Sequence, residues 1–102
     1  MSVTMRIVQQ YDVTHENEFL ELERKFAELE AKRPDYPNGR RMKPISSSDP
    51  CHTLIWECSF PDISAARAAL DFFEGDSAHE ELSRQQVAFF RSVRVEFYEN
   101  LD

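Results

Sequence analysis

The sequence contains few of the residues that make flexible loops, covalent bridges and cationic surfaces. Its 102 residues include 2 glycines and 2 cysteines, and 12 lysines and arginines stand against 19 aspartates and glutamates. The net charge of −7 argues against a nucleic-acid or anionic-membrane partner, since both require a concentrated cationic surface. No stretch approaches the roughly 18 consecutive apolar residues of a membrane span, and no apolar leader opens the chain. We therefore expect a cytoplasmic protein.

The cysteines predict neither a disulfide nor a metal site. Cys51 and Cys58 lie on one predicted strand, which would hold them roughly 20 Å apart and on opposite faces, too far apart for a bridge. With His15, His52 and His79 they form none of the short repeated spacings that bind zinc. We expect reduced thiols, no metal, and a melting temperature that chelators and reductants leave unchanged.

What the sequence does contain is a regular succession of strand and helix patterns. Alternation over residues 4–13 predicts a strand, and an apolar stripe through Phe19, Leu22, Phe26 and Leu29 predicts a helix. This helix begins with Thr14 as its cap and ends before Pro34. Further elements are predicted as an exposed edge strand at 39–45 carrying Arg40, Arg41 and Lys43, a central strand at 52–60, a helix capped by Asp62 and ended by Gly75, a helix capped by Ser77, and a strand at 93–98.

The order of these elements is β-α-β-β-α-β, with the second helical region broken. That order is the split βαβ or ferredoxin-like arrangement, an α+β fold. We expect one domain over residues 1–102, with a four-stranded antiparallel sheet in the strand order 4-1-3-2. Helices cover one face of such a sheet and leave the other open, so the function depends on what the open face carries.

The predicted open face is apolar and aromatic. It takes Arg6, Val8 and Gln10 from the first strand and Arg94, Glu96 and Tyr98 from the fourth. If Thr53 and Ile55 face the helices, the third strand adds Leu54, Trp56, Cys58 and Phe60 to the open face. An apolar patch of this kind marks an interface or a ligand site. A second copy stacked about a two-fold axis would cover it.

Three segments resemble those of the dimeric α+β-barrel superfamily. They are Met-Arg-Ile-Val-Gln-Gln-Tyr-Asp-Val at 5–13, Leu-Ile-Trp-Glu at 54–57, and Gly-Asp-Ser-Ala-His-Glu-Glu-Leu at 75–82. The superfamily includes antibiotic-biosynthesis monooxygenases, haem-degrading monooxygenases, NIPSNAP-like proteins and stress-responsive barrel proteins. The resemblance implies a homodimer whose two sheets form a barrel, and a pocket between sheet and helices for an aromatic or polycyclic substrate.

The resemblance implies little about haem. Haem-degrading members use an asparagine on the first strand, a tryptophan on the third and a histidine on the second helical region. Trp56 matches the tryptophan, and Gln9 or Gln10 stands at the asparagine. The histidine position falls near Leu82, with His79 about one turn away, so haem binding is the less favoured reading.

Two functions remain open. One is a cofactor-independent, monooxygenase-like enzyme acting on an aromatic compound, and the other is a non-catalytic ligand-binding or assembly protein of the same fold. In either case Trp56, Gln10 and Tyr98 are the predicted ligand contacts, and Arg6 or Arg94 would bind an acidic or phenolic group. No catalytic residue is assigned; His79 is a base only if it lies beneath the sheet.

Overall fold

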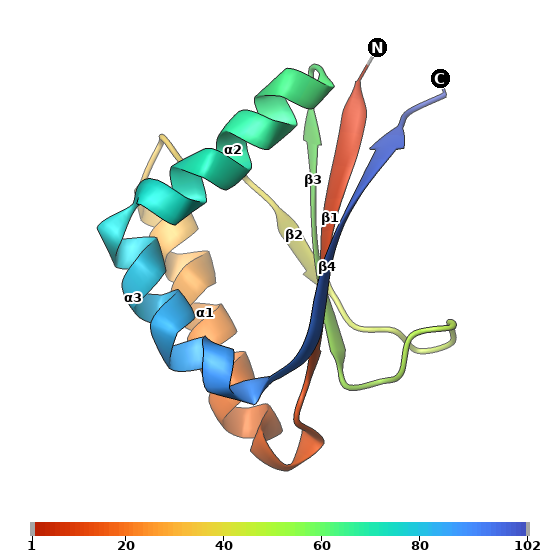
Figure 1. Ribbon diagram of the computed structural model, residues 1–102, viewed down its shortest axis with the longest axis vertical. Helices are drawn as coiled ribbons and strands as arrows, with labels where there is room; N and C mark the ends of the chain where they lie inside the picture. Colours follow the sequence, from red (N-terminus) through yellow and green to blue (C-terminus); the bar gives the residue numbers. More distant parts are fainter. Residues whose placement is uncertain (1, 102) are drawn as a thin grey trace.

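The computed structural model describes residues 2–101, in which the helices pack on one side of a four-stranded antiparallel sheet (Figure 1). The strand order β2-β3-β1-β4 confirms the predicted ferredoxin-like α+β arrangement. Within these residues no helix has the length and apolarity that a membrane span requires. The elements are β1 (Val3–Tyr11), α1 (Glu16–Lys32), β2 (Arg40–Met42), β3 (Thr53–Phe60), α2 (Ile63–Gly75), α3 (Ser77–Gln86) and β4 (Phe90–Glu99), with 3-10 turns at Val13–His15 and Val87–Phe89.

The caps of α1 and α2 follow from short-range hydrogen bonds. Asp62 caps α2 as predicted, because its carboxylate accepts the Ala65 N–H at 2.8 Å. The predicted Thr14 cap of α1 is wrong. Asp12 accepts the Thr14 N–H at 3.0 Å and starts a 3-10 turn instead, and α1 itself begins at Glu16.

A single aspartate organises the junction between α2 and α3. Asp76 has extended backbone angles that end α2, and its carboxylate accepts the His79 N–H at 3.1 Å to cap α3. The predicted Ser77 cap and the predicted left-handed Gly75 are therefore both wrong, since Gly75 is the last residue of α2 and has no positive φ. The same carboxylate also accepts hydrogen bonds from Tyr36 and Arg33, which ties the loop after α1 to this junction.

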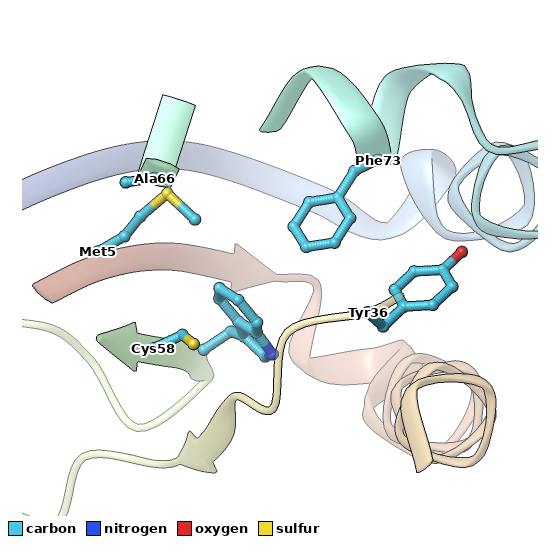
Figure 2. Packing of buried hydrophobic residues seen from close by; sticks show 6 residues of the cluster. Met5, Tyr36, Cys58, Ala66 and Phe73 are labelled. Carbon is cyan, nitrogen blue, oxygen red and sulfur yellow. The ribbon is translucent and has the colours of Figure 1, made fainter. Parts of the chain in front are cut away.

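The core lies between the sheet and the helices. One cluster joins Met5, Trp56 and Cys58 of the sheet to Ala66 and Phe73 of α2, with Tyr36 from the loop after α1 (Figure 2). A second cluster, near the beginning of α1, contains Tyr11, Phe19 and Leu54, and the Tyr11 and Phe19 rings stack at 4.3 Å. The Cys58 thiol donates to the Asn38 carbonyl at 3.5 Å, and Cys51 is exposed.

The predicted orientation of β3 is wrong. Register pairs Trp56 with Ile7 and Cys58 with Met5, and directly paired residues project from the same face. Leu54, Trp56, Cys58 and Phe60 therefore face the helices, while Thr53 and Ile55 lie on the open face. The strand is apolar at consecutive positions, so its own sequence does not distinguish the two faces. The pairing of β3 with β1, whose orientation is as predicted, distinguishes the two faces.

Gly39 allows the Trp56 indole to pack directly against the chain before β2. A Cβ at position 39 would lie 2.0 Å from Cε2 of Trp56, which is well inside van der Waals contact. Only a residue without a side chain fits there. The position of the indole, which is central to the site described below, thus depends on a glycine distant in sequence.

We expect Gly39→Ala to lower the free energy of unfolding by about 1–3 kcal/mol, because the indole must shift within a packed core. Gly75→Ala is the matched control. Nothing lies within 4 Å of its added methyl, and Gly75 is helical, so we expect a gain of about 0.5–1 kcal/mol. Urea denaturation of both variants measures the difference. A Gly39→Ala protein as stable as wild type would contradict this packing.

Candidate functional site

A cavity of about 120 Å³ lies between the helices and the sheet. This is several times the space that one water molecule needs. Its apolar wall combines sheet and helix residues, so it forms only when the two layers pack together. The apolar lining residues are Ile7, Phe26, Trp56, Phe73, Phe90 and Val93.

A buried ion-pair network forms the polar side of the cavity. Arg41 of β2 reaches α1, where its Nε donates to Glu23 at 2.8 Å and its Nη2 to Glu30 at 2.6 Å. All three side chains are largely buried, with exposed fractions of 20% for Arg41, 6% for Glu23 and 11% for Glu30. Burial opposes the charge of Arg41, but its hydrogen bonds to both glutamates prevail and raise its pKa.

The prediction that Arg41 lies in solvent on an edge strand is therefore wrong. β2 contains only Arg40–Met42, and Arg41 pairs with Trp56 on the helix side, whereas Arg40 lies opposite Glu57 on the open face. One residue of the basic cluster is thus turned inward by strand alternation. The acidic pair on α1 compensates its buried charge.

Two glutamines lie at the cavity, and one of them joins this network. Gln86, at the end of α3, donates from Nε2 to Glu23 at 2.8 Å, which joins α3 to α1. Gln9 of β1 lines the cavity and is 8% exposed. Within residues 2–101, no group hydrogen-bonds to its buried Oε1. A buried carbonyl oxygen without a donor is costly, so Gln9 provides an unused acceptor at the cavity.

Trp56 joins the apolar and polar sides. Its indole N–H donates to Glu30 at 3.2 Å, while its ring meets Phe73 edge-on with centroids 5.8 Å apart. An aromatic residue with its polar atom satisfied in this way is held in one orientation. Trp56 is therefore a fixed wall of the cavity.

His79 of α3 also lines the cavity, beside two aromatic rings. Its ring stacks on Phe73 with centroids 4.8 Å apart and 6° between planes, and it lies 4.8 Å from the Phe26 ring. Burial lowers the pKa of His79, which favours the neutral imidazole at neutral pH. Its Nδ1 is 3.4 Å from the Ser83 hydroxyl. A neutral imidazole at a cavity wall can accept a proton.

The structure separates the five predicted ligand contacts. Trp56 lines the cavity, whereas Arg6, Gln10, Arg94 and Tyr98 lie on the open face, as their register with one another shows. On that face the Arg6 guanidinium lies 5.2 Å above the Tyr98 ring and bonds Glu57 at 2.8 Å. Arg94 bonds Asp49 at 2.9 Å and Glu96 at 2.7 Å. These arginines are thus already paired.

Sequence reasoning missed most of the polar side of the cavity. Alternation along β1 already places Gln9 with Met5 and Ile7 on the helix side. The orientation of Gln9 could therefore have been predicted from the sequence. Glu23 gave no such signal, because a glutamate next to an apolar stripe is ordinarily solvated. Its burial depends on Arg41 and Gln86, which are distant in sequence.

The residues present do not suit a metal or haem. Within residues 2–101, no group of three or more histidine, cysteine or acidic side chains is placed to hold a metal ion. Glu23 and Glu30 would also oppose the carboxylates of haem, and Arg41 is already paired with both. We therefore derive no step through either group.

Several solved structures have the same fold at low sequence identity, whereas neither a protein-family model nor a curated protein matches the chain. An uncharacterised NIPSNAP domain protein from Burkholderia xenovorans aligns with TM-score 0.78 and 16% identity over 99% of this chain and 95% of its own. SnoaB, a cofactor-independent oxygenase from Streptomyces nogalater, aligns with TM-score 0.66 and 14% identity over 99% and 94%.

A dimeric ferredoxin-like protein of unknown function from Jannaschia aligns with TM-score 0.69 and 16% identity over 98% of this chain and 100% of its own. Such identities establish a common fold and leave the chemistry to the site itself. The chain thus has the ferredoxin-like α+β fold that NIPSNAP domain proteins and the oxygenase SnoaB share, the fold that its sequence predicts.

Proposed function

We propose that the protein binds a small aromatic molecule in the cavity between the helices and the sheet. The observation that carries this proposal is Trp56, whose indole is fixed by Glu30 and Phe73 at the wall of the cavity. Apolar walls with a few convergent polar groups are the usual form of a small-molecule site. The likeness in fold to SnoaB, described as a cofactor-independent oxygenase, extends over 99% of this chain and so includes both the sheet and the helices that line the cavity.

The reaction that we propose is a cofactor-independent oxygenation of the bound aromatic by dioxygen, in which a CH2 group of the substrate becomes C=O, the second oxygen atom leaves as water, and the substrate itself supplies the electrons. SnoaB, which has this fold, is described as a cofactor-independent oxygenase. In this chain the neutral His79 would act as the base that removes a proton from the substrate, next to the aromatic walls Phe26 and Phe73. The alternative is a non-catalytic ligand-binding protein, which the same cavity would serve. Dioxygen uptake with compounds that bind distinguishes the two.

Binding can be followed at Trp56 directly. Trp56 is the only tryptophan, so its indole N–H gives a single side-chain cross-peak in a ¹H–¹⁵N correlation spectrum. We expect saturable movement of this cross-peak with at least one member of a panel of naphthalenes carrying hydroxyl, aminoethyl or carboxyethyl groups. A panel that leaves the Trp56 signal in place would contradict the proposal.

A pair of substitutions on α3 locates the binding. Ser83 lines the cavity, so we expect Ser83→Leu to occupy part of it and to weaken binding at least about tenfold. Gln85→Leu, on the exposed side of the same helix, should bind as wild type does. Equal affinities in the two variants would place the ligand elsewhere.

We further propose that the open face of the sheet forms a homodimer. This face carries positive and negative side chains that form ion pairs. Arg6 and Arg40 pair with Glu57, and Arg94 pairs with Asp49 and Glu96. A surface of mixed sign can be complementary to itself about a two-fold axis. The similar Jannaschia structure is described as dimeric, which supports an assembly of two copies.

Sedimentation equilibrium should therefore give about twice the chain mass at micromolar concentration. Val8 is a poor test position, because it is already only 2% exposed within one protomer. Ile55, half-buried beside Val8 on the open face, is better, and Ile55→Lys should shift the equilibrium toward monomer. Val95→Lys, on the opposite face of β4, is the control. A monomeric wild type would rule out the dimer.

A further inference from the structure

We infer that the ligand carries a protonated amine on its aromatic ring system. This inference rests on the proposed function of the cavity and specifies the chemical class that the cavity selects. It follows from three features: which hydrogen-bonding groups are already used, which are not, and the sign of the charge around them.

The strongest donors of the cavity already serve its two carboxylates. Each of the three guanidinium nitrogens of Arg41 donates to a carboxylate, Nε to Glu23 and both Nη atoms to Glu30. The indole N–H of Trp56 also donates to Glu30, and Nε2 of Gln86 donates to Glu23. A carboxylate ligand would have to share these donors with Glu23 and Glu30, whose negative charges repel it.

The acceptors are in surplus. The Gln9 Oε1 is buried without a donor among the residues that the structure describes, in a side chain that is more than nine-tenths buried and lines the cavity. The Glu23 and Glu30 carboxylates also carry more lone pairs than their partners use. A ligand that donates hydrogen bonds would satisfy a group that is otherwise left unpaired at a free-energy cost.

The charge of the lining is negative. Glu23 and Glu30 oppose a single guanidinium, that of Arg41, and burial favours the uncharged form of His79 by lowering its pKa. A hollow of about 450 Å³ adjoins the cavity and shares Phe73, His79 and Ser83 with it. Its other lining residues are Glu74 and Glu80, so the approach to the cavity is also acidic. Such a lining attracts cations and repels anions.

The walls suit a cation that is attached to an aromatic ring. Phe26, Trp56 and Phe73 present aromatic surfaces to the cavity, and the face of an aromatic ring attracts an ammonium group. The expectation from sequence was the reverse, an acidic or phenolic ligand held by Arg6 or Arg94. Those arginines lie on the other face of the sheet, and Arg41, the arginine within the cavity, is neutralised by two carboxylates.

Isothermal titration calorimetry with three matched compounds tests the inference. They are 2-(naphthalen-1-yl)ethylammonium, 2-(naphthalen-1-yl)ethanol and 3-(naphthalen-1-yl)propionate, which share one ring and differ in charge. We expect the ammonium compound to bind at least about tenfold more tightly than the carboxylate, with the alcohol between them. If the carboxylate binds as tightly as the ammonium compound, this inference fails and the proposed function stands. If none of the three binds, both fail.

A substitution at the unused acceptor gives a second readout. Gln9→Met keeps the volume of the side chain and removes its oxygen, so we expect the ammonium compound to lose about tenfold in affinity while the carboxylate changes little. Gln85→Met, on the exposed side of α3, is the control for an added methionine. Unchanged ammonium affinity in a folded Gln9→Met protein would overturn the role of Gln9. If this variant does not fold, the wild-type ratio of affinities still decides.

Discussion

The buried guanidinium of Arg41 is the constraint on which the cavity depends. It lies on a strand of three residues at the edge of the sheet and connects that strand to α1 through Glu23 and Glu30. A buried charge must be compensated, so edge strand and helix are held at a fixed separation. Glu30 also accepts the indole N–H of Trp56, which makes the aromatic wall depend on the same ion pairs.

The sequence predicted ligand contacts and dimer contacts on the same open face of the sheet, whereas the structure places the cavity on the helix side. On the helix side, Trp56, Gln9 and Arg41 surround a space for a small molecule. On the open side, the side chains of Arg6, Arg94 and Tyr98 bind nearby carboxylates. The proposed ligand contacts and the proposed dimer contacts therefore come from alternate residues of the same strands, because successive side chains of a strand point to opposite faces.

The fold was predictable from the sequence, whereas only part of the site was. Most strands and helices have their own periodic signal, the edge strand β2 was predicted from its position, and the order of the elements indicates the topology. The face of β3 was not predictable from Leu54-Ile55-Trp56, because apolar residues occupy both faces there and only the register with β1 decides. Arg41 and Glu23 were missed because each is buried only when the other is near.

A double-mutant cycle between Arg41 and Glu30 tests most directly whether this ion-pair network holds the cavity together. The free energy of unfolding would be measured for wild type, Arg41→Met, Glu30→Gln and the double variant. The account predicts a coupling free energy of about 1–3 kcal/mol, since both side chains are largely buried and share two hydrogen bonds. A coupling below about 0.3 kcal/mol would contradict it, because independent residues could not fix β2 against α1.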